Sequence, residues 1–494
     1  MEKLKALIKT KTLIYTILIL LGMGLFIHLD CKNITAHYDD AYSIFLSKAS
    51  YSDIWSVTAS DVHPPLYYWG LKAFTSLFGD SLFSFRCFST LGLLAVILLG
   101  CFPVRKLFGH RVAISFILLI IIFPVSQYLA TEIRMYSWTM FFVLASALSA
   151  FQVYRIGKMQ YWLLFLFTGL CAAYLHNYGL LSLFGIYLIL LVFLIKEKKQ
   201  WKGIFLWGIL FLLIYLPWLI QLISQIGMIS EDYWIKPLTV NDLFLHIYYF
   251  YSPKEIWLPF TDFSKVQMMI GLIIIMLIQL FLTLAALITS LRSKEKSSDY
   301  IILSFIIFLI PVTIGALVSV TYLPVLVTRY MTCSFGLFVL GLAMVLAKSF
   351  DKYKWLTMLF FLLLLVDSGI RISSGLKYYS QTGTAYKEIR DFAIKEKTFV
   401  VNDFSYHVMP RLQLIAPGNH YQVLVFDTTD VDFRPFVFDK INSLPAGEFI
   451  LVHQEREAVQ QDFHHFWQTV GSQYIITDSL HASDIYLYRI RLKE

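Results

Sequence analysis

Residues 13–27 read LIYTILILLGMGLFI, an apolar run that follows four lysines within the first eleven residues. A helix needs about 20 mostly apolar residues to cross the hydrocarbon core of a membrane. No small-residue cleavage site closes the run, so we expect a retained first transmembrane helix and not a removed signal peptide.

Ten further apolar stretches extend this pattern over the first three quarters of the chain. The chain of 494 residues is 58% hydrophobic and only 15% charged, which excludes an ordinary soluble enzyme and a disordered chain. The sequence therefore predicts an α-helical polytopic membrane protein with about 11 transmembrane helices. The predicted spans are 12–29, 83–102, 112–129, 136–154, 161–175, 179–195, 203–223, 267–290, 300–320, 330–347 and 355–370.

Basic residues alternate between the loops. If the N-terminus is cytoplasmic, the inner segments hold 19 Lys and Arg residues and the outer loops hold 8 over a greater length. The positive-inside rule selects this orientation. It also explains the formal net charge of +8, so no nucleic-acid partner is expected. Acids that fall in the outer loops include Asp39, Asp40, Asp53, Asp61, Glu132, Glu231 and Asp232.

The last part of the chain, 371–494, has a different pattern. Helix-like stretches at 386–395 and 456–467 alternate with short apolar or alternating runs. This pattern predicts a small soluble α/β domain, which an odd number of spans places outside the cytoplasm. Residues 1–370 then form the transmembrane domain, with interfacial helices in the outer loop 31–82. The strand-like runs are 399–401, 422–426, 449–452, 474–476 and 485–490.

Two segments of the first outer loop carry the strongest chemical signal. Residues 37–42 read HYDDAY and residues 61–69 read DVHPPLYYW. Apolar residues between them follow helical spacing, which suits a helix lying flat on the membrane surface, and either proline can open a second one. Two such helices would bring Asp39 and Asp61 together. A lone acid here usually only caps a helix or is solvated, but paired acids can activate a hydroxyl or bind a divalent cation.

These segments, with Phe-Gly-Asp at 78–80 and the nearby Arg86, resemble the family 39 glycosyltransferases of the GT-C fold. That family includes protein O-mannosyltransferases and bacterial aminoarabinose transferases. The resemblance covers most of residues 10–350 but not the tail. Many members have Asp-Glu where this chain has Asp39-Asp40, so the second acid is one methylene shorter. Further matching segments are EIRMY at 132–136, YLHNYG at 174–179 and TRY at 328–330.

The resemblance implies catalytic roles for three acids. Asp39 would deprotonate the acceptor hydroxyl, and Asp40 and Asp61 would support it. The family uses an inverting single displacement, without a covalent sugar intermediate, and takes its sugar from a polyprenyl or dolichyl phosphate at the outer membrane face.

A lipid-phosphate donor requires cations at the membrane surface, because charge grows on the phosphate as the sugar leaves. Arg134 and Arg329 are the only arginines in the two short outer loops, and the resemblance assigns them to the donor phosphate together with His63. A snorkelling arginine that fixes a helix end is the alternative for each. The predicted sugar or acceptor pocket consists of Tyr136, His176, Asn177, Tyr178 and Tyr330.

The sequence thus predicts a membrane glycosyltransferase that moves a monosaccharide from a polyprenyl-phosphate donor to an acceptor hydroxyl outside the cytoplasm of a bacterial cell. The acceptor, whether glycan, lipid or protein, is open. A lipid or polysaccharide flippase or transporter, or a polysaccharide polymerase, is the alternative. No nucleotide motif is present, and the five scattered cysteines show no disulfide or zinc spacing. No cofactor or metal is expected, although the paired acids permit a divalent cation.

Overall fold

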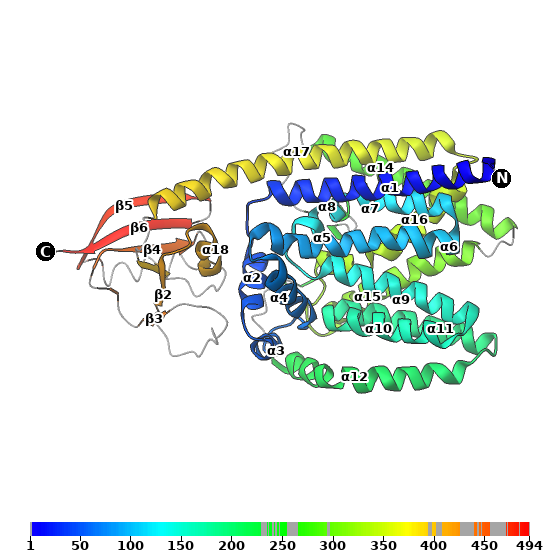
Figure 1. The fold of residues 1–494 in the computed structure, drawn as a ribbon, viewed down its shortest axis with the longest axis horizontal. Coiled ribbons are helices and arrows are strands. Elements are labelled where there is room, and N and C mark those ends of the chain that lie inside the picture. Colours follow the sequence, from blue (N-terminus) through cyan, green and yellow to red (C-terminus); the bar gives the residue numbers. More distant parts are fainter. Residues whose placement is uncertain are drawn as a thin grey trace. The chain divides into compact units, whose positions relative to one another are not determined.

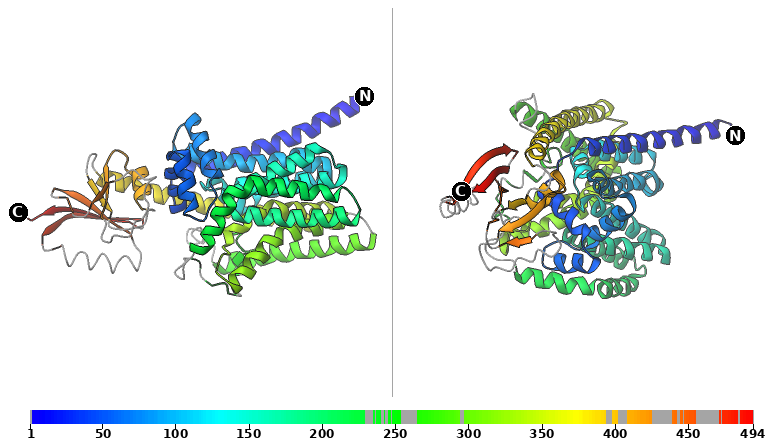
Figure 2. Two further views of the ribbon diagram at one scale, coloured as in Figure 1. Left: turned by 90° about the horizontal axis from the view of Figure 1, so that it is seen from below. Right: turned by 60° about the vertical axis from the view of Figure 1, so that its left-hand side comes forward.

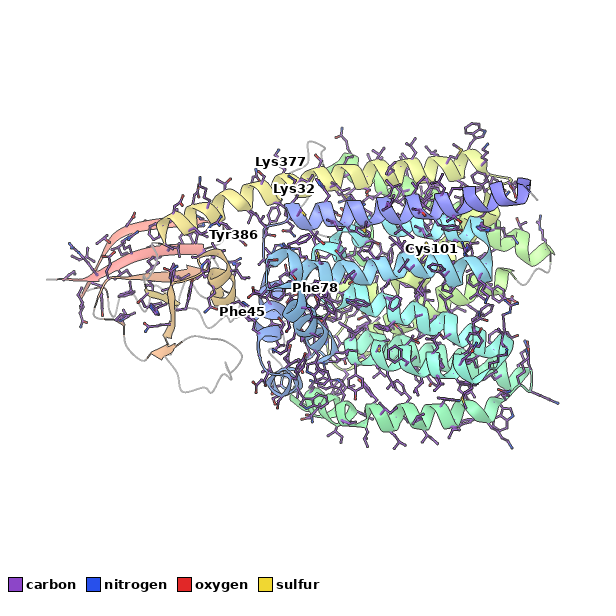
Figure 3. The ribbon with its side chains drawn as sticks, viewed as in Figure 1. Lys32, Phe45, Phe78, Cys101, Lys377 and Tyr386 are labelled. Carbon is purple, nitrogen blue, oxygen red and sulfur yellow. The ribbon has the colours of Figure 1, made fainter. Side chains whose placement is uncertain are left out.

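The computed structural model describes residues 2–228, 265–293 and 297–393 continuously. Elsewhere it describes 235, 237–239, 242, 245–246, 248–253, 398–401, 408–424, 439–441, 444–445, 447–454, 471, 473–483 and 485–493. The chain divides into two compact units. The bundle unit comprises Met1–Cys31 and Thr58–Leu376, and the sheet unit comprises Lys32–Val57 and Lys377–Glu494. Figure 3 labels Lys32 and Lys377, where the chain enters the sheet unit each time.

Long helices that run alongside one another form the bundle unit (Figures 1 and 2). Helix α9 contacts α5, α10 and α11, and α16 contacts α7 and α15. The elements are α1 (Glu2–Lys32), α4 (Leu66–Phe78), α5 (Leu82–Leu99), the π-helical η1 (Gly100–Val104), α6 (Arg105–Phe108), α7 (His110–Ile122), α8 (Pro124–Thr131), α9 (Tyr136–Ile156), α10 (Met159–Leu175), α11 (Asn177–Lys196), α12 (Trp201–Met228), α14 (Lys265–Ser293), α15 (Ser297–Thr321), the 3-10 helix η3 (Thr328–Ser334), α16 (Phe335–Ser349) and the first part of α17 (Lys354–Phe392).

Each of the eleven predicted spans is helical in the structure. Among the described residues, nine helices are long and apolar enough to cross a membrane, and the pair α7 and α8 makes a tenth if it counts as one span. Helix α10, with 17 residues, is the shorter apolar helix at the remaining position. The prediction of a polytopic α-helical membrane protein is therefore confirmed.

The span predicted at 112–129 is broken in the structure. Helices α7 and α8 meet at an angle of 59°, with Phe123 in an extended conformation between them and Pro124 as the first residue of α8. Proline has no backbone N–H and disfavours a helical conformation of the residue before it. A second irregularity lies in η1, which contains Pro103 and the buried Cys101 labelled in Figure 3.

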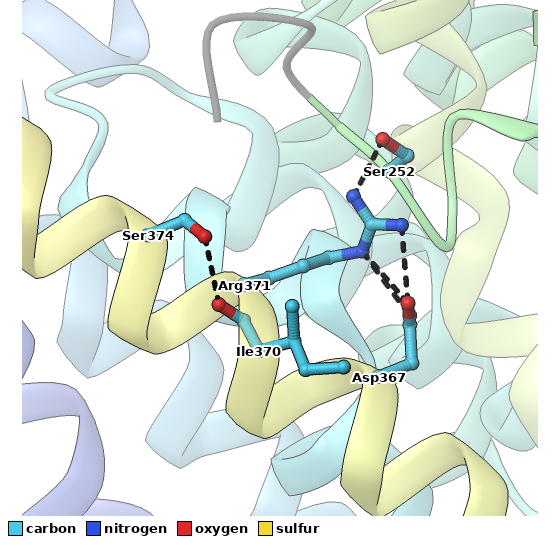
Figure 4. Close-up of polar contacts among 5 residues, drawn as sticks. All are labelled: Ser252, Asp367, Ile370, Arg371 and Ser374. Carbon is cyan, nitrogen blue, oxygen red and sulfur yellow. Dashed lines mark hydrogen bonds and ion pairs between the residues drawn. The ribbon is translucent and has the colours of Figure 1, made fainter. Parts of the chain in front are cut away.

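A fully buried arginine joins α17 to the segment 249–253 (Figure 4). The Nε of Arg371 donates to both carboxylate oxygens of Asp367 at 3.1 Å, and its Nη1 donates to Ser252 Oγ at 2.7 Å. A buried charge that lost its partner would be strongly destabilising. The ion pair and the serine together therefore hold the segment 249–253 against α17.

The sheet unit contains six strands in the order β3-β2-β1-β4-β6-β5. Strands β1 to β4 pair in parallel, and β6 pairs antiparallel with β4 and β5. Its other elements are helices α2 and α18 and the end of α17. The bounds are α2 (Tyr38–Lys48), α18 (Val408–Ile415), β1 (Thr398–Val401), β2 (His420–Leu424), β3 (Asp439–Ile441), β4 (Phe449–Gln454), β5 (Tyr474–Ala482) and β6 (Ile485–Leu492), and α3 (Tyr51–Ala59) crosses from the sheet unit into the bundle unit.

Alternation along the strands gives the sheet two apolar faces. Phe399 and Ile450 pack with Ile389 of α17 and Leu412 of α18, whereas the neighbouring Val400 packs on the opposite face. Successive side chains of a strand point to opposite faces, so each short apolar run serves both. All five predicted runs contain or overlap a strand, but the sequence did not reveal β3 or α18. The predicted helix at 386–395 is the end of α17, and 456–467 lies outside the described residues.

Candidate active site

Five ring side chains from four segments meet in the bundle unit. The ring centroid of His176 lies 4.8 Å from that of Tyr330, 5.5 Å from that of His63 and 5.6 Å from that of Tyr136. The rings of Tyr178 and Tyr330 are 5.2 Å apart. All five side chains are buried. The structure thus brings together five residues that the sequence predicted for the site, and we call them the ring cluster.

The break between α10 and α11 fixes the centre of this cluster. His176 is extended there, and its Nδ1 accepts a hydrogen bond of 3.0 Å from the backbone N–H of Tyr178. This contact satisfies one of the N–H groups that a helix start leaves without a partner. A Cβ on Gly179 would lie 2.2 Å from the carbonyl oxygen of Ala172. The sequence His-Asn-Tyr-Gly therefore forms a tight helix start that requires glycine in its last position.

Two hydrogen bonds tie this helix start to the other segments of the ring cluster. The Nδ2 of Asn177 donates to the carbonyl oxygen of Val62 at 3.0 Å, next to His63. The hydroxyl of Tyr178 donates to the carbonyl oxygen of Val325 at 3.0 Å, shortly before η3. Asn177, predicted for the sugar pocket, thus uses its amide to hold the loop that carries His63.

The pKa of His176 reflects its burial and the positive charges near the ring cluster. Burial, Arg134 and Arg329 together lower the pKa of its imidazole to about 3, so the ring is neutral at physiological pH. Its Nε2 has no hydrogen-bond partner among the described residues. Since both arginines act on the same ring, the structure places the two predicted phosphate ligands beside the ring cluster.

The two arginines differ in exposure. Arg134 is 3% exposed and its Nη1 donates to the hydroxyl of Tyr68 at 3.3 Å. Arg329 is only partly buried, and its guanidinium lies 5.9 Å from the ring centroid of Tyr330. Arg134 is therefore packed within the bundle unit, whereas Arg329, at the start of η3, lies against the ring of Tyr330 and keeps some exposure.

Glu132 and Tyr249 are two buried polar residues that were not among the predicted site residues. Glu132 is 5% exposed. Burial, then Glu132 and Tyr136, raise the pKa of the Tyr249 hydroxyl well above its usual value, and Arg329 opposes them. The sequence showed Glu132 as an outer acid within a matching motif. Tyr249 lies in an aromatic run, Tyr-Tyr-Phe-Tyr at 248–251, and carried no signal that distinguished it from packing residues.

Asp61 lies at the start of the loop that leads to His63. It is partly exposed, and its backbone N–H donates to the carbonyl oxygen of Thr58 at 3.2 Å. The same turn is held from α12, where Gln225 Nε2 donates to Thr58 O at 2.9 Å. The loop is thus anchored in the bundle unit on both sides of Asp61.

Asp39 and Asp40 belong to the sheet unit, in the first turn of α2. Asp40 is fully buried, and its carboxylate accepts a hydrogen bond of 3.3 Å from the backbone N–H of His37. Asp39 is partly exposed. Asp40 therefore makes a helix-capping contact, and the approach of Asp39 to Asp61 stays a prediction.

Among the described residues, no group of three or more His, Cys, Asp or Glu side chains could hold a metal ion. The segment 231–234, for which the sequence permits an acceptor-binding or lid role, lies outside the described residues.

Comparison with known proteins shows the fold of the chain and a family match over part of it. A family model described as dolichyl-phosphate-mannose-protein mannosyltransferase matches residues 62–221, the segment that carries His63, Arg134, Tyr136 and His176. The crystal structure of ArnT from Cupriavidus metallidurans in the apo state superposes with a TM-score of 0.63 at 10% sequence identity, over 96% of this chain and 97% of that chain. This chain has the GT-C glycosyltransferase fold.

The same ArnT bound to undecaprenyl phosphate gives a TM-score of 0.59 at 10% identity, with the same shares of each chain. No curated protein matches by sequence. The predicted GT-C fold is therefore confirmed, and the structural match includes the fold of the small C-terminal sheet domain. The family model supports the resemblance to the family 39 glycosyltransferases over residues 62–221.

Proposed function

We propose that this protein is a membrane glycosyltransferase that moves a monosaccharide from a polyprenyl phosphate to an acceptor hydroxyl outside the cytoplasm. The buried ring cluster around His176, with the guanidinium of Arg329 5.9 Å from the ring centroid of Tyr330 and the buried Arg134 on Tyr68, is the observation that carries the proposal. The family match and the fold shared with an ArnT that binds undecaprenyl phosphate support it. The N-terminus is then cytoplasmic, and the active site and the C-terminal domain lie outside the cytoplasm of a bacterial cell.

The donor phosphate binds between the two arginines in this proposal. A guanidinium presents a planar fork of donors to phosphate oxygens, and a buried site strengthens that attraction. The neutral His176 adds no third charge, and its Nε2 can exchange a hydrogen bond with a phosphate or sugar oxygen. His63, Tyr136, Tyr178 and Tyr330 supply ring faces and hydroxyls for the sugar.

The transfer itself needs one base. Asp39 takes the proton of the acceptor hydroxyl as the hydroxyl oxygen bonds to the anomeric carbon. The bond from that carbon to the phosphate oxygen breaks, and its electron pair leaves on the lipid phosphate beside the arginines. Asp40 positions Asp39 by closing the first turn of α2, and Asp61 supports the acceptor. A general base contributes roughly 10²- to 10⁴-fold to such a step.

No cofactor is required for this displacement, since the arginines carry the charge that develops on the leaving group. Dialysis against EDTA tests this directly: activity that persists supports a metal-independent reaction, and activity that returns only with added divalent cation assigns a metal to the acids.

Asp39→Asn in the full-length protein, reconstituted into liposomes, is the deciding experiment. The assay follows release of polyprenyl phosphate from a panel of labelled polyprenyl-phosphate hexoses and pentoses, with candidate glycan, lipid and peptide acceptors. We expect a loss of about 10³-fold in kcat, with carrier binding retained. Asp53→Asn is the matched control, because Asp53 is an exposed acid of the neighbouring α3 whose carboxylate accepts from Ser50 Oγ. Equal activity of Asp39→Asn and wild type overturns the assignment.

A flippase or a polymerase would behave differently in the same assay. A flippase moves labelled lipid between leaflets without releasing polyprenyl phosphate. A polymerase releases it only when the acceptor is a second lipid-linked glycan.

A further inference from the structure

A cavity opens in the bundle unit, lined by residues that the ring cluster does not include. It has a volume of about 730 Å³ and lies among α6, α9, α11, α15 and α16. Ligand pockets in proteins are commonly of this size, roughly 300–1,000 Å³. Its lining comes from the late turns of α9 and α11 and the early turns of α15, which are the ends that the charge pattern assigns to the cytoplasm.

The inner wall of the cavity is apolar. Ile186 and Leu190 of α11 are 2% and 4% exposed, and Leu337 and Leu340 of α16 are 2% and 3% exposed. These side chains are buried in the protein, so the cavity extends inward between helices and is more than a dent in the surface that faces lipid. A hydrocarbon chain suits such walls.

Aromatic rings surround the opening. The ring centroids of Phe151 and Tyr300 lie 5.0 Å apart, those of Phe108 and Phe151 5.7 Å, and those of Tyr154 and Phe193 5.6 Å. Aromatic side chains gather where a membrane protein meets the head-group region. The opening therefore lies at the level expected for a lipid head group.

The rim of the opening is cationic. Glu197 is engaged by the hydroxyl of Tyr154 and by Lys199, whose Nζ lies 2.5 Å from its Oε2. This leaves Arg155 and Lys196, both exposed, against the single acid Asp299. The rim can therefore receive one negatively charged group.

We propose that this cavity binds an anionic, phosphate-headed lipid of the cytoplasmic leaflet, with its chain between α9, α11, α15 and α16 and its phosphate between Arg155 and Lys196. A glycerophospholipid and a polyprenyl phosphate share this chemistry. The site is separate from the transfer chemistry, and its occupancy is measured without any assay of transfer.

The test measures lipid binding to the purified full-length protein by native mass spectrometry. The probes are phosphatidylglycerol, undecaprenyl phosphate and zwitterionic phosphatidylcholine. Arg155→Gln/Lys196→Gln removes the rim charge, and Ala147→Trp fills the cavity from α9. The matched control is Lys158→Gln/Lys198→Gln, which removes two charges from the same two loops at positions outside the cavity lining.

We expect the charge variant to bind the anionic probe roughly 25-fold more weakly, since each of its two basic residues near an anionic head group contributes roughly a fivefold change in affinity. Ala147→Trp should also weaken binding, because the new side chain occupies the space of the hydrocarbon chain. The control should bind as the wild type does. The tighter of the two anionic probes identifies the source of the lipid. Equal binding of phosphatidylcholine, or an equal loss in the control, overturns the proposal. If Ala147→Trp does not fold, the charge variant and its control still decide the question.

Discussion

The ring cluster of the bundle unit and helix α2 of the sheet unit hold the candidate site residues in two different ways. In the bundle unit, four segments converge on rings that are all buried. In the sheet unit, Asp39 lies partly exposed on the first turn of α2, a helix whose other side chains are mostly buried. In the proposed function, donor recognition would thus depend on a packed core, whereas the base would act from the partly exposed position of Asp39. Substitutions in the bundle unit should change carrier affinity and stability, and substitutions in α2 should change the rate of transfer.

Of the substitutions that test this difference, those at the two arginines should have the largest effect. Arg134→Gln/Arg329→Gln should lower kcat/KM by about 10³-fold, because both donors to the developing phosphate charge are lost. Binding of undecaprenyl phosphate, measured by native mass spectrometry, should fall with it. Arg111→Gln is the control, since Arg111 is an exposed arginine that pairs with Asp351 at 2.7 Å. If the double variant binds the carrier as wild type does, the donor phosphate does not bind at the ring cluster.

Gly179→Ala tests the rigidity of the same region through packing alone. The new Cβ would meet the carbonyl oxygen of Ala172 at 2.2 Å and the Cγ2 of Thr139 at 3.0 Å. The backbone of Ala172 cannot move away without distorting the last turn of α10. We therefore expect a loss of about 3 kcal/mol in the free energy of unfolding. Thermal unfolding in detergent measures it. Gly24→Ala in α1, where a Cβ meets nothing within 4 Å, should be neutral or slightly stabilising, and a similar loss in both variants would contradict the tight helix start.

The buried histidine predicts a specific pH dependence of stability. The folded protein holds His176 with a pKa of about 3, and an unfolded histidine titrates near 6.5. Between these values the unfolded chain binds more protons, so the stability is full above pH 6.5 and falls as the pH drops toward 3. From pH 6.5 to 5 this group should cost about 2 kcal/mol.

His176→Gln should lack that part of the pH dependence. The measurement is the unfolding midpoint of wild type and variant at pH 6.5, 5.75 and 5. His28→Gln, at an exposed histidine of α1, serves as the control and should follow the wild type. Parallel curves for wild type and His176→Gln would mean that the folded protein protonates the ring.

These contrasts show which features a sequence can reveal. The spans follow from apolar length, a local property, so helices were predicted at all eleven positions. The break at Pro124 was missed because a run of apolar residues on both sides of a proline still has the length of one span. The ring cluster was predicted only through the motif resemblance, because its contacts join residues as distant as His63 and Tyr330. Tyr249 was missed since only its neighbours Glu132 and Arg329, far along the chain, distinguish it from a packing tyrosine.

We expect the smallest effect at Asp40. Substitutions there distinguish the roles of the two acids of α2. Its buried carboxylate accepts from the backbone N–H of His37, a contact that an amide oxygen can replace. Asp40→Asn should therefore keep transfer within about threefold of wild type, whereas Asp40→Ala should lose about 1 kcal/mol of stability and lower kcat without changing carrier binding. Asp39→Asn differs from Asp40→Asn only in position, so the pair separates a proton acceptor from a helix cap. If both amides abolish transfer equally, the two acids share the proton and the capping contact is incidental.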